Sequence, residues 1–127
     1  MKSKILIIED EMSLANVLRM KFEQSNFEVY IAGEGEQGIE LAKENEPDMI
    51  LLDLILPNES GFDILRKMKK IDEIKDIPVI ILTNSNRADK VDKGFELGAV
   101  DYLLKAHFNI EKVVDRVKSH VNKKKSA

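Results

Sequence analysis

Short apolar runs alternate with amphipathic stretches along the whole chain, and this alternation is the feature that most constrains the fold. The runs are short enough to be strands, and they occupy residues 4–8, 27–31, 49–52, 79–82 and 102–104. Between the runs, apolar side chains recur at helical spacing. The first such face contains Leu14, Val17, Leu18 and Phe22, and Ser13 is its expected cap. The pattern predicts a strand followed by a helix, five times over.

Glycine and proline set the expected ends of the other helices. The second helix is expected to stop at residues 45–47, where a proline follows, and the third to begin near Gly61. Gly98 is the expected C-cap of the fourth helix. The last helix is expected to carry apolar side chains from Ile110 to Val121 on one face. No linker or repeat interrupts the alternation.

Repeated strand–helix units predict an α/β fold with a parallel sheet covered by helices on both faces. We expect a five-stranded doubly wound sheet of the flavodoxin-like type, with strand order 2-1-3-4-5. The run at residues 27–31 mixes polar with apolar side chains, which favours a place near a sheet edge. The fold accounts for residues 1–122 as one domain and leaves residues 123–127 as a basic C-terminal tail.

Composition excludes several classes of protein. The chain has 127 residues, of which 43% are hydrophobic and 34% charged, as in a globular protein. Its net charge of −3 argues against nucleic-acid or membrane binding, and a solvated helix end is the expected role of the lysines in residues 118–125. There is no cysteine, signal peptide or long apolar segment. The expected location is the cytoplasm.

Four of the predicted strands run out into polar residues that suit phosphate or magnesium chemistry. Glu9 and Asp10 follow the first strand, Asp53 the third, Thr83 the fourth and Lys105 the fifth. The carboxyl ends of parallel strands meet at one edge of a sheet, which is where open α/β sheets bind ligands. Clustered carboxylates repel one another, and Mg²⁺ relieves such repulsion. Taken singly, each residue has the ordinary alternative of capping or solvating a turn.

Four segments resemble the receiver domains of bacterial response regulators. Residues 5–11 are similar to the first strand and acidic cluster of that family, and residues 53–61 to its phosphoacceptor loop. Residues 77–83 are similar to its fourth strand, and residues 98–105 to its fifth. The segments occur in the family's order and spacing, and the resemblance covers the whole chain.

The resemblance implies a site that accepts phosphate with the help of Mg²⁺. Asp53 would receive a phosphoryl group from a histidine kinase or a small phosphodonor. Asp10, Asp53 and the backbone carbonyl of Ile55 would bind the metal directly, while Glu9 would act through a water. Two further residues would bind phosphoryl oxygens: Lys105 through its ammonium group and Asn84 through its backbone. The protein is not a conventional enzyme in this reading, although it would catalyse its own phosphorylation and a slow hydrolysis of the product.

The resemblance also implies a switch. Thr83 would donate its hydroxyl to the phosphoryl group, and Tyr102 would turn inward as Thr83 moves. The surface of the fourth helix, fifth strand and fifth helix would then change for an unidentified downstream protein. Candidates for that surface are Val91, Phe95, Tyr102 and Val114. The protein is expected to be a monomer or a phosphorylation-dependent dimer, in which Asp101, Arg116 and Lys118 are candidates for a charged pairing face.

Three residues depart from the family pattern. Glu9 stands where an aspartate is more frequent, and Asn84 follows Thr83 where a small residue is usual. Ala106 follows Lys105 where the family has a proline with a cis peptide, a bond that costs about 2.5–4 kcal/mol before any other residue. We therefore expect a strained bond or a rearranged loop at residues 106–108. Two histidines, His107 and His120, are expected to be solvated.

Two other classes of protein remain as alternatives. The first is an interaction module that keeps the fold without being phosphorylated, for which Asn84 and Ala106 are the best support. The second is a phosphatase of the haloacid-dehalogenase type, which needs a second aspartate two residues after its nucleophile. That position is Ile55 here, which argues strongly against the phosphatase. A single-domain regulator is the expected type if the chain ends at Ala127.

Overall fold

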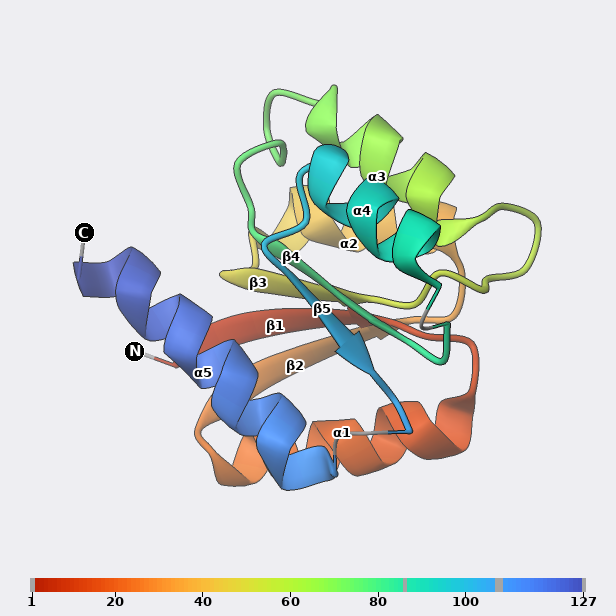
Figure 1. Ribbon diagram of the computed structural model, residues 1–127. Coiled ribbons are helices and arrows are strands. Elements are labelled where there is room, and N and C mark those ends of the chain that lie inside the picture. The colour runs from red at the N-terminus through yellow and green to blue at the C-terminus, as the bar shows by residue number, and fades with distance from the viewer. Residues whose placement is uncertain (1, 86, 107–108, 127) are drawn as a thin grey trace.

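Strands and helices alternate from one end of the chain to the other in the computed structural model, which describes residues 2–85, 87–106 and 109–126. Their order confirms the predicted alternation (Figure 1). The strands are β1 (Ser3–Ile8), β2 (Phe27–Ala32), β3 (Met49–Leu52), β4 (Val79–Thr83) and β5 (Asp101–Leu104). The helices are α1 (Met12–Gln24), α2 (Gly35–Asn45), α3 (Gly61–Lys69), α4 (Ala88–Glu96) and α5 (Ile110–Ser126).

The strands form one parallel sheet in the order β2-β1-β3-β4-β5, as predicted. Ile8 at the end of β1 pairs with Leu52 at the end of β3, and Thr83 in β4 pairs with Leu104 in β5. The carboxyl ends of these four strands therefore lie at one edge. The residues that follow each strand start from neighbouring positions along that edge.

Helices cover both faces of the sheet. α2, α3 and α4 lie on one side, and α1 and α5 lie on the other (Figure 1). Successive side chains of a strand point to opposite faces, so Leu6 and Ile8 of β1 pack on the side of α2 and α3. Ile5 and Ile7 pack on the side of α1 and α5. Two-sided burial is the reason that β1, β3 and β4 are almost wholly apolar in sequence.

Helix α1 differs from the sequence prediction at two places. It begins at Met12 with Glu11 at the N-cap position, so the expected cap at Ser13 is wrong. Val17 was expected in the core but is 43% exposed. The buried face consists of Ala15, Leu18 and Phe22, and one residue step rotates a helix by about 100°, which carries Val17 out of that face.

The ends of α2 and α4 lie close to the predicted signals, whereas the end of α5 does not. α2 ends at Asn45, and Glu46 after it has the left-handed φ of 48°. Gly98 was predicted as the C-cap of α4; the C-cap residue is Leu97, and Gly98, with φ of 103°, directly follows it. α5 continues to Ser126, through part of the segment that the sequence suggested as a tail.

Among the residues described, no helix has the length and apolar character needed to cross a bilayer.

His120 is not a solvated surface residue, contrary to the prediction. Its Nε2 lies 2.9 Å from Oδ2 of Asp101, and its side chain is 21% exposed. Asp101 is buried at the start of β5 and also binds Arg116, whose Nε lies 2.7 Å from Asp101 Oδ2. The Asp101 carboxylate is therefore used within the chain to fasten α5 to β5. The prediction missed this pairing because the partners are 15 to 19 residues apart.

Gly61 brings the start of α3 against the end of β3. Its amide donates to the carbonyl oxygen of Leu54 over 2.8 Å and closes the base of the β3–α3 loop. A Cβ atom at this position would clash with the carbonyl oxygen of Asp53 and lie 2.7 Å from Cα of Leu54. The obstacle is backbone, which cannot move aside as a flexible side chain can. Only glycine therefore fits without displacing the loop that carries Asp53.

We predict that Gly61→Ala lowers the free energy of unfolding by about 1–3 kcal/mol, the usual cost of forcing extra atoms into a packed site. Gly33→Ala is the matched control, because nothing lies within 4 Å of a Cβ atom built on Gly33. Its effect should stay within about 0.5 kcal/mol. Urea unfolding of the two variants measures the difference, and equal stabilities would contradict the close approach at Gly61.

Candidate functional site

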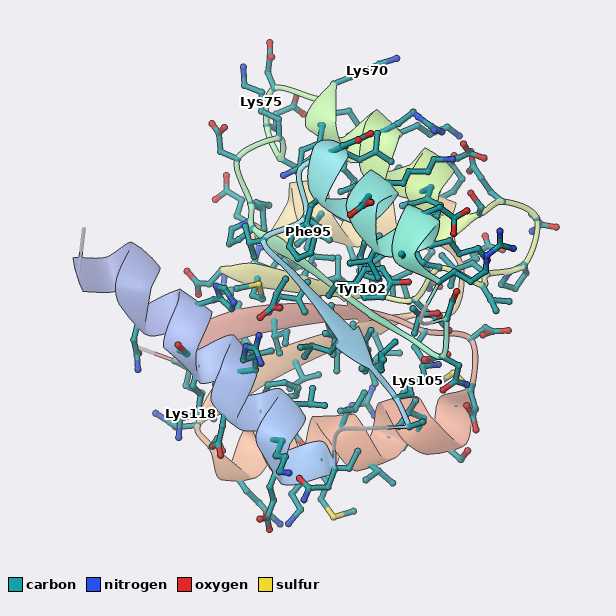
Figure 2. All side chains as sticks on the ribbon, viewed as in Figure 1. Lys70, Lys75, Phe95, Tyr102, Lys105 and Lys118 are labelled. Atoms are coloured by element: carbon teal, nitrogen blue, oxygen red, sulfur yellow. The ribbon has the colours of Figure 1, made fainter. Side chains whose placement is uncertain are left out.

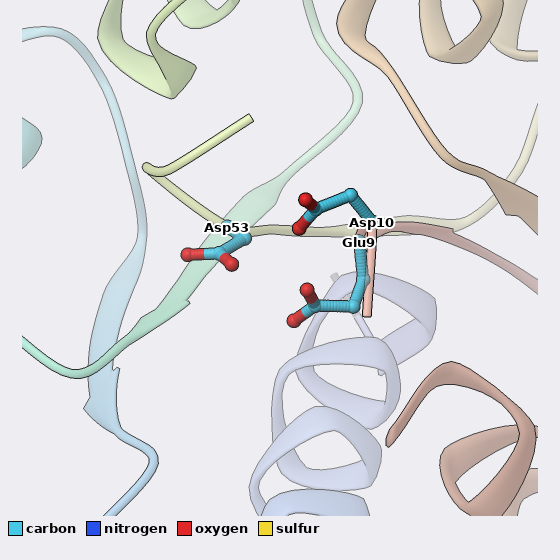
Figure 3. Close-up of side chains that lie close together, drawn as sticks. All are labelled: Glu9, Asp10 and Asp53. Carbon is cyan, nitrogen blue, oxygen red and sulfur yellow. The ribbon is translucent and has the colours of Figure 1, made fainter. Parts of the chain in front are cut away.

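Three carboxylates meet at the carboxyl edge of the sheet. Glu9 and Asp10 follow β1, and Asp53 follows β3 (Figure 3). One oxygen from each lies within 4.8 Å of the others. Glu9 and Asp53 are buried, with 3% and 6% exposed, whereas Asp10 is exposed. The backbone fixes this placement, because the Asp53 amide donates to the Ile8 carbonyl over 3.1 Å.

Lys105 supplies the positive charge of the cluster. Its Nζ lies 2.6 Å from Oε1 of Glu9 and 3.0 Å from Oδ2 of Asp53. The side chain is only 15% exposed, so solvent screens these ion pairs weakly. Lys105 leaves the end of β5, where its amide donates to the Thr83 carbonyl over 2.8 Å, and Figure 2 shows its place at this end of the strand.

The departure at Ala106 does not turn Lys105 away. Every peptide bond of the described residues is trans, including the bond between Lys105 and Ala106. The lysine nevertheless reaches both acids. The expected strained cis bond is therefore absent at this position. The remainder of that expectation concerns residues 107 and 108, His107 among them, which lie outside the described residues.

Burial disfavours the charged forms of both Glu9 and Lys105, but the hydrogen bonds of the site outweigh it only for Lys105. Burial raises the pKa of Glu9, and its hydrogen bond with Lys105 offsets only part of this effect. For Lys105, burial acts to lower the pKa, but the hydrogen bonds to Glu9 and Asp53 outweigh it and raise the pKa. Lys105 is therefore charged at neutral pH. One ammonium group facing three carboxylates leaves the cluster short of positive charge.

This donor set fits a hard divalent cation. All the available ligands are oxygens, and Asp10 is exposed toward solvent, where a metal could keep several waters. Few protein oxygens together with waters is how Mg²⁺ is usually held. Ile55 lies beside the cluster, because its amide is 3.3 Å from Oδ1 of Asp53. The direct contact between Glu9 and Lys105 was not foreseen from the sequence.

Thr83 has a buried hydroxyl without a hydrogen-bond partner among the described residues. It is fully buried at the end of β4, between the strands that carry Asp53 and Lys105. An unpaired buried hydroxyl costs free energy and is uncommon in native proteins. Such a group is available to donate to a ligand that enters the site.

Tyr102 connects the same edge to helix α4. Its hydroxyl donates to the carbonyl oxygen of Ser85 over 2.8 Å, two residues beyond Thr83. Gly94 of α4 lies against this ring, since an added Cβ atom would be 3.3 Å from Cδ2 of Tyr102. Figure 2 shows Tyr102 below α4, with Phe95 nearby.

The structure brings together most of the predicted site residues but not all of the predicted surface. Glu9, Asp10, Asp53 and Lys105 form one cluster. Asn84 is exposed beyond β4. The candidate surface residues differ: Phe95 is 47% exposed and Val91 is half-buried, but Val114 is only 5% exposed and packs in the core.

Comparison with known proteins places this geometry in a family. The sequence model of the response regulator receiver domain matches residues 5–118. The chain is 41% identical over 118 residues to the response regulator ArlR of Staphylococcus saprophyticus. This match covers 92% of the chain and 51% of ArlR, so the chain spans about half the length of that relative.

Solved structures agree with this assignment. The non-phosphorylated HemR receiver domain of Leptospira biflexa is 31% identical, with a TM-score of 0.85 and 94% of each chain covered. A CheY-like receiver domain protein of Methanospirillum hungatei has a TM-score of 0.91, with 99% and 98% of the two chains covered, and at 21% identity it bears on the fold alone. The chain belongs to the family of response regulator receiver domains.

Proposed function

We propose that this receiver domain is a phosphorylation-dependent switch of a two-component system, with Asp53 as the phosphoacceptor. The observation that carries the proposal is the ion pair between Lys105 Nζ and Asp53 Oδ2, 3.0 Å long, beside Glu9 and Asp10. Glu9 also contacts Lys105, but it follows β1, whereas Asp53 follows β3, the strand next to β4 and the unpaired hydroxyl of Thr83.

The transfer is a displacement at phosphorus. A carboxylate oxygen of Asp53 forms a bond to the phosphorus atom, and the bond from phosphorus to the donor breaks. The donor is the phosphohistidine of a histidine kinase or a small acyl phosphate, which leaves with the electron pair of the broken bond. Lys105 would offset negative charge on the phosphoryl oxygens, and the backbone amide of Asn84 would donate to another oxygen.

We assign the metal site to Asp10, Asp53 and the Ile55 carbonyl, with Glu9 acting through a water. A bound Mg²⁺ would supply positive charge against the phosphoryl oxygens. Lys105 would keep its bond to Glu9 while it binds the phosphoryl group, since its Nζ contacts both acids. Glu9 thereby holds the lysine in the site.

The switch connects the phosphoryl group to helix α4. Thr83 is the proposed donor to the phosphoryl group, because its buried hydroxyl is unpaired within the described residues. Its movement would displace the segment after β4, and Ser85 in that segment accepts the hydrogen bond of Tyr102. The surface formed by α4, β5 and α5 then differs between the two states, which is what a downstream protein would read.

The unphosphorylated interaction module is disfavoured by the same geometry. Its support was Ala106, but Lys105 contacts Asp53 without a proline at that position. Its other support was Asn84, which is exposed rather than packed into the site. As the family implies, we further propose that a histidine kinase donates the phosphoryl group and that a downstream protein binds the altered surface. We also propose that the protein is cytoplasmic and is a monomer or a phosphorylation-dependent dimer.

Incubation with Mg²⁺ and acetyl phosphate should add the mass of one phosphoryl group to the intact protein. Asp53→Asn should remain unmodified, because an amide oxygen is not a nucleophile of this kind. Asp10→Asn is the comparison, since it weakens the metal site but keeps the acceptor, and it should be modified more slowly. Intact-mass spectrometry measures all three proteins. An adduct that persists in Asp53→Asn would show that another residue is the acceptor.

Thr83→Val should raise the free energy of unfolding of the unmodified protein by about 1 kcal/mol, because it removes an unpaired buried hydroxyl and keeps the shape. Thr83→Ser is the control, since it keeps the hydroxyl and loses a buried methyl group, and it should lower the stability. Urea unfolding measures both variants. A marked loss of stability in Thr83→Val would mean that the hydroxyl has a partner in the unmodified protein.

A further inference from the structure

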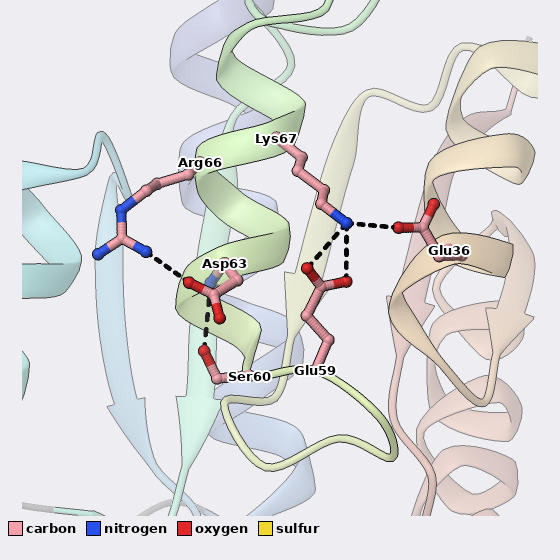
Figure 4. Close-up of polar contacts among 6 residues, drawn as sticks. All are labelled: Glu36, Glu59, Ser60, Asp63, Arg66 and Lys67. Carbon is pink, nitrogen blue, oxygen red and sulfur yellow. Dashed lines mark hydrogen bonds and ion pairs between the residues drawn. The ribbon is translucent and has the colours of Figure 1, made fainter.

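A charged cluster outside the acidic site fastens the β3–α3 loop to two helices. It consists of Glu36 of α2, Glu59 of the loop and Lys67 of α3, and we call it the loop clamp (Figure 4). Lys67 Nζ lies 2.7 Å from Oε1 of Glu36. The same atom lies 2.8 Å and 3.0 Å from the two carboxylate oxygens of Glu59. One ammonium group thus joins three elements of the fold.

The loop that is clamped carries the proposed acceptor and the proposed metal carbonyl. It runs from Asp53 through Ile55 to Ser60, immediately before α3. Its base is closed by the bond from the Gly61 amide to the Leu54 carbonyl. Most of its outer part is exposed: Ile55 is 68% exposed and residues 57, 58 and 60 are exposed, while Leu56 packs partly against the core. Side-chain contacts therefore matter more here than in a buried turn.

A second contact ties the same loop to the start of α2. The side-chain nitrogen of Asn58, Nδ2, donates to Oε2 of Glu34 over 3.4 Å. Asn58 has the left-handed φ of 70°. This bond is long and exposed, so it is weak by itself. Glu59 is less exposed than its clamp partners, at 23%. The Glu59–Lys67 contact is therefore the stronger of the two ties.

Lys67 is charged at neutral pH. Hydrogen bonds from Lys67 to Glu36 and to Glu59 raise the pKa of its ammonium group. Exposed ion pairs are usually worth little, but here one lysine bridges two acids on different elements. The contact therefore opposes relative movement of α2, the loop and α3.

We propose that Lys67 is a positioning residue of the phosphorylation site, acting through Glu59 on the loop that carries Asp53 and Ile55. This inference rests on the proposed function, because it concerns the same metal site. With the clamp in place, the Ile55 carbonyl and the Asp53 carboxylate keep their spacing to Asp10. Without it, the loop samples positions in which the three oxygens do not bind one cation together.

The test compares Lys67→Met with Arg66→Met. Both variants remove one positive charge from α3, but Arg66 pairs only with Asp63 of the same helix in the contacts that the described residues show, so the loop stays tied (Figure 4). Hydrogen exchange of the Gly61 and Ile55 amides should be about two- to fivefold faster in Lys67→Met, the range expected for the loss of exposed ion pairs. Arg66→Met should leave both amides unchanged.

Calorimetric titration with Mg²⁺ alone gives the functional readout. The Kd for Mg²⁺ should rise about two- to fivefold in Lys67→Met, and Lys67→Arg should restore the wild-type value, because arginine can bridge the same two acids. Equal exchange rates in Lys67→Met and Arg66→Met would overturn the clamp. Faster exchange with an unchanged Kd would overturn its positioning role.

These outcomes are distinct from a failure of the proposed function. A wild-type protein that takes up no phosphoryl group from acetyl phosphate would contradict the function of Asp53. The amide exchange would still decide whether Lys67 holds the loop, because that measurement needs neither metal nor phosphodonor.

Discussion

The contact of one ammonium group with two buried carboxylates is the interaction on which the site depends. Lys105 reaches Glu9 and Asp53 because β5 and β3 end at the same edge of a parallel sheet, with β4 between them. Burial makes Glu9 costly to ionise, and Lys105 offsets only part of that cost. One ammonium group beside three carboxylates leaves the site with an excess of negative charge. This excess suits the site to a divalent cation, whose charge together with that of Lys105 would offset the negative charge of a phosphoryl group in the proposed function.

The second constraint is the unpaired hydroxyl of Thr83. This hydroxyl is buried and has no hydrogen-bond partner among the described residues, which lowers the stability of the unphosphorylated protein. A phosphoryl oxygen would remove that cost by accepting its hydrogen bond. In the proposed switch, the difference in free energy between these two states would displace the segment after β4. Because Ser85 in that segment binds Tyr102, the displacement has a route to α4.

The fold and the placement of Glu9, Asp10, Asp53 and Lys105 at one edge of the sheet were largely predictable from the sequence, because both follow from the periodicity of apolar residues. Apolar runs that are buried on both faces identify strands, and the polar residue after each run must lie at the common edge. Side-chain partners were less predictable. The resemblance implied a water-mediated metal contact for Glu9 and did not predict that its side chain also contacts Lys105 directly. The sequence also made His120 a surface residue, although Asp101 binds it from β5. Such pairings depend on how helices are rotated and how long side chains extend, and no local pattern records either.

Amide NMR of the protein with Mg²⁺ and beryllofluoride, a mimic of the phosphoryl group, measures whether Thr83 couples Asp53 to α4. If Thr83 transmits the state of Asp53, the amides of Thr83, Tyr102 and Phe95 should all shift in the wild-type protein. In Thr83→Val the shifts at Tyr102 and Phe95 should be lost, while those beside Asp53 remain. Shifts at Tyr102 and Phe95 that are the same size in Thr83→Val would contradict the account.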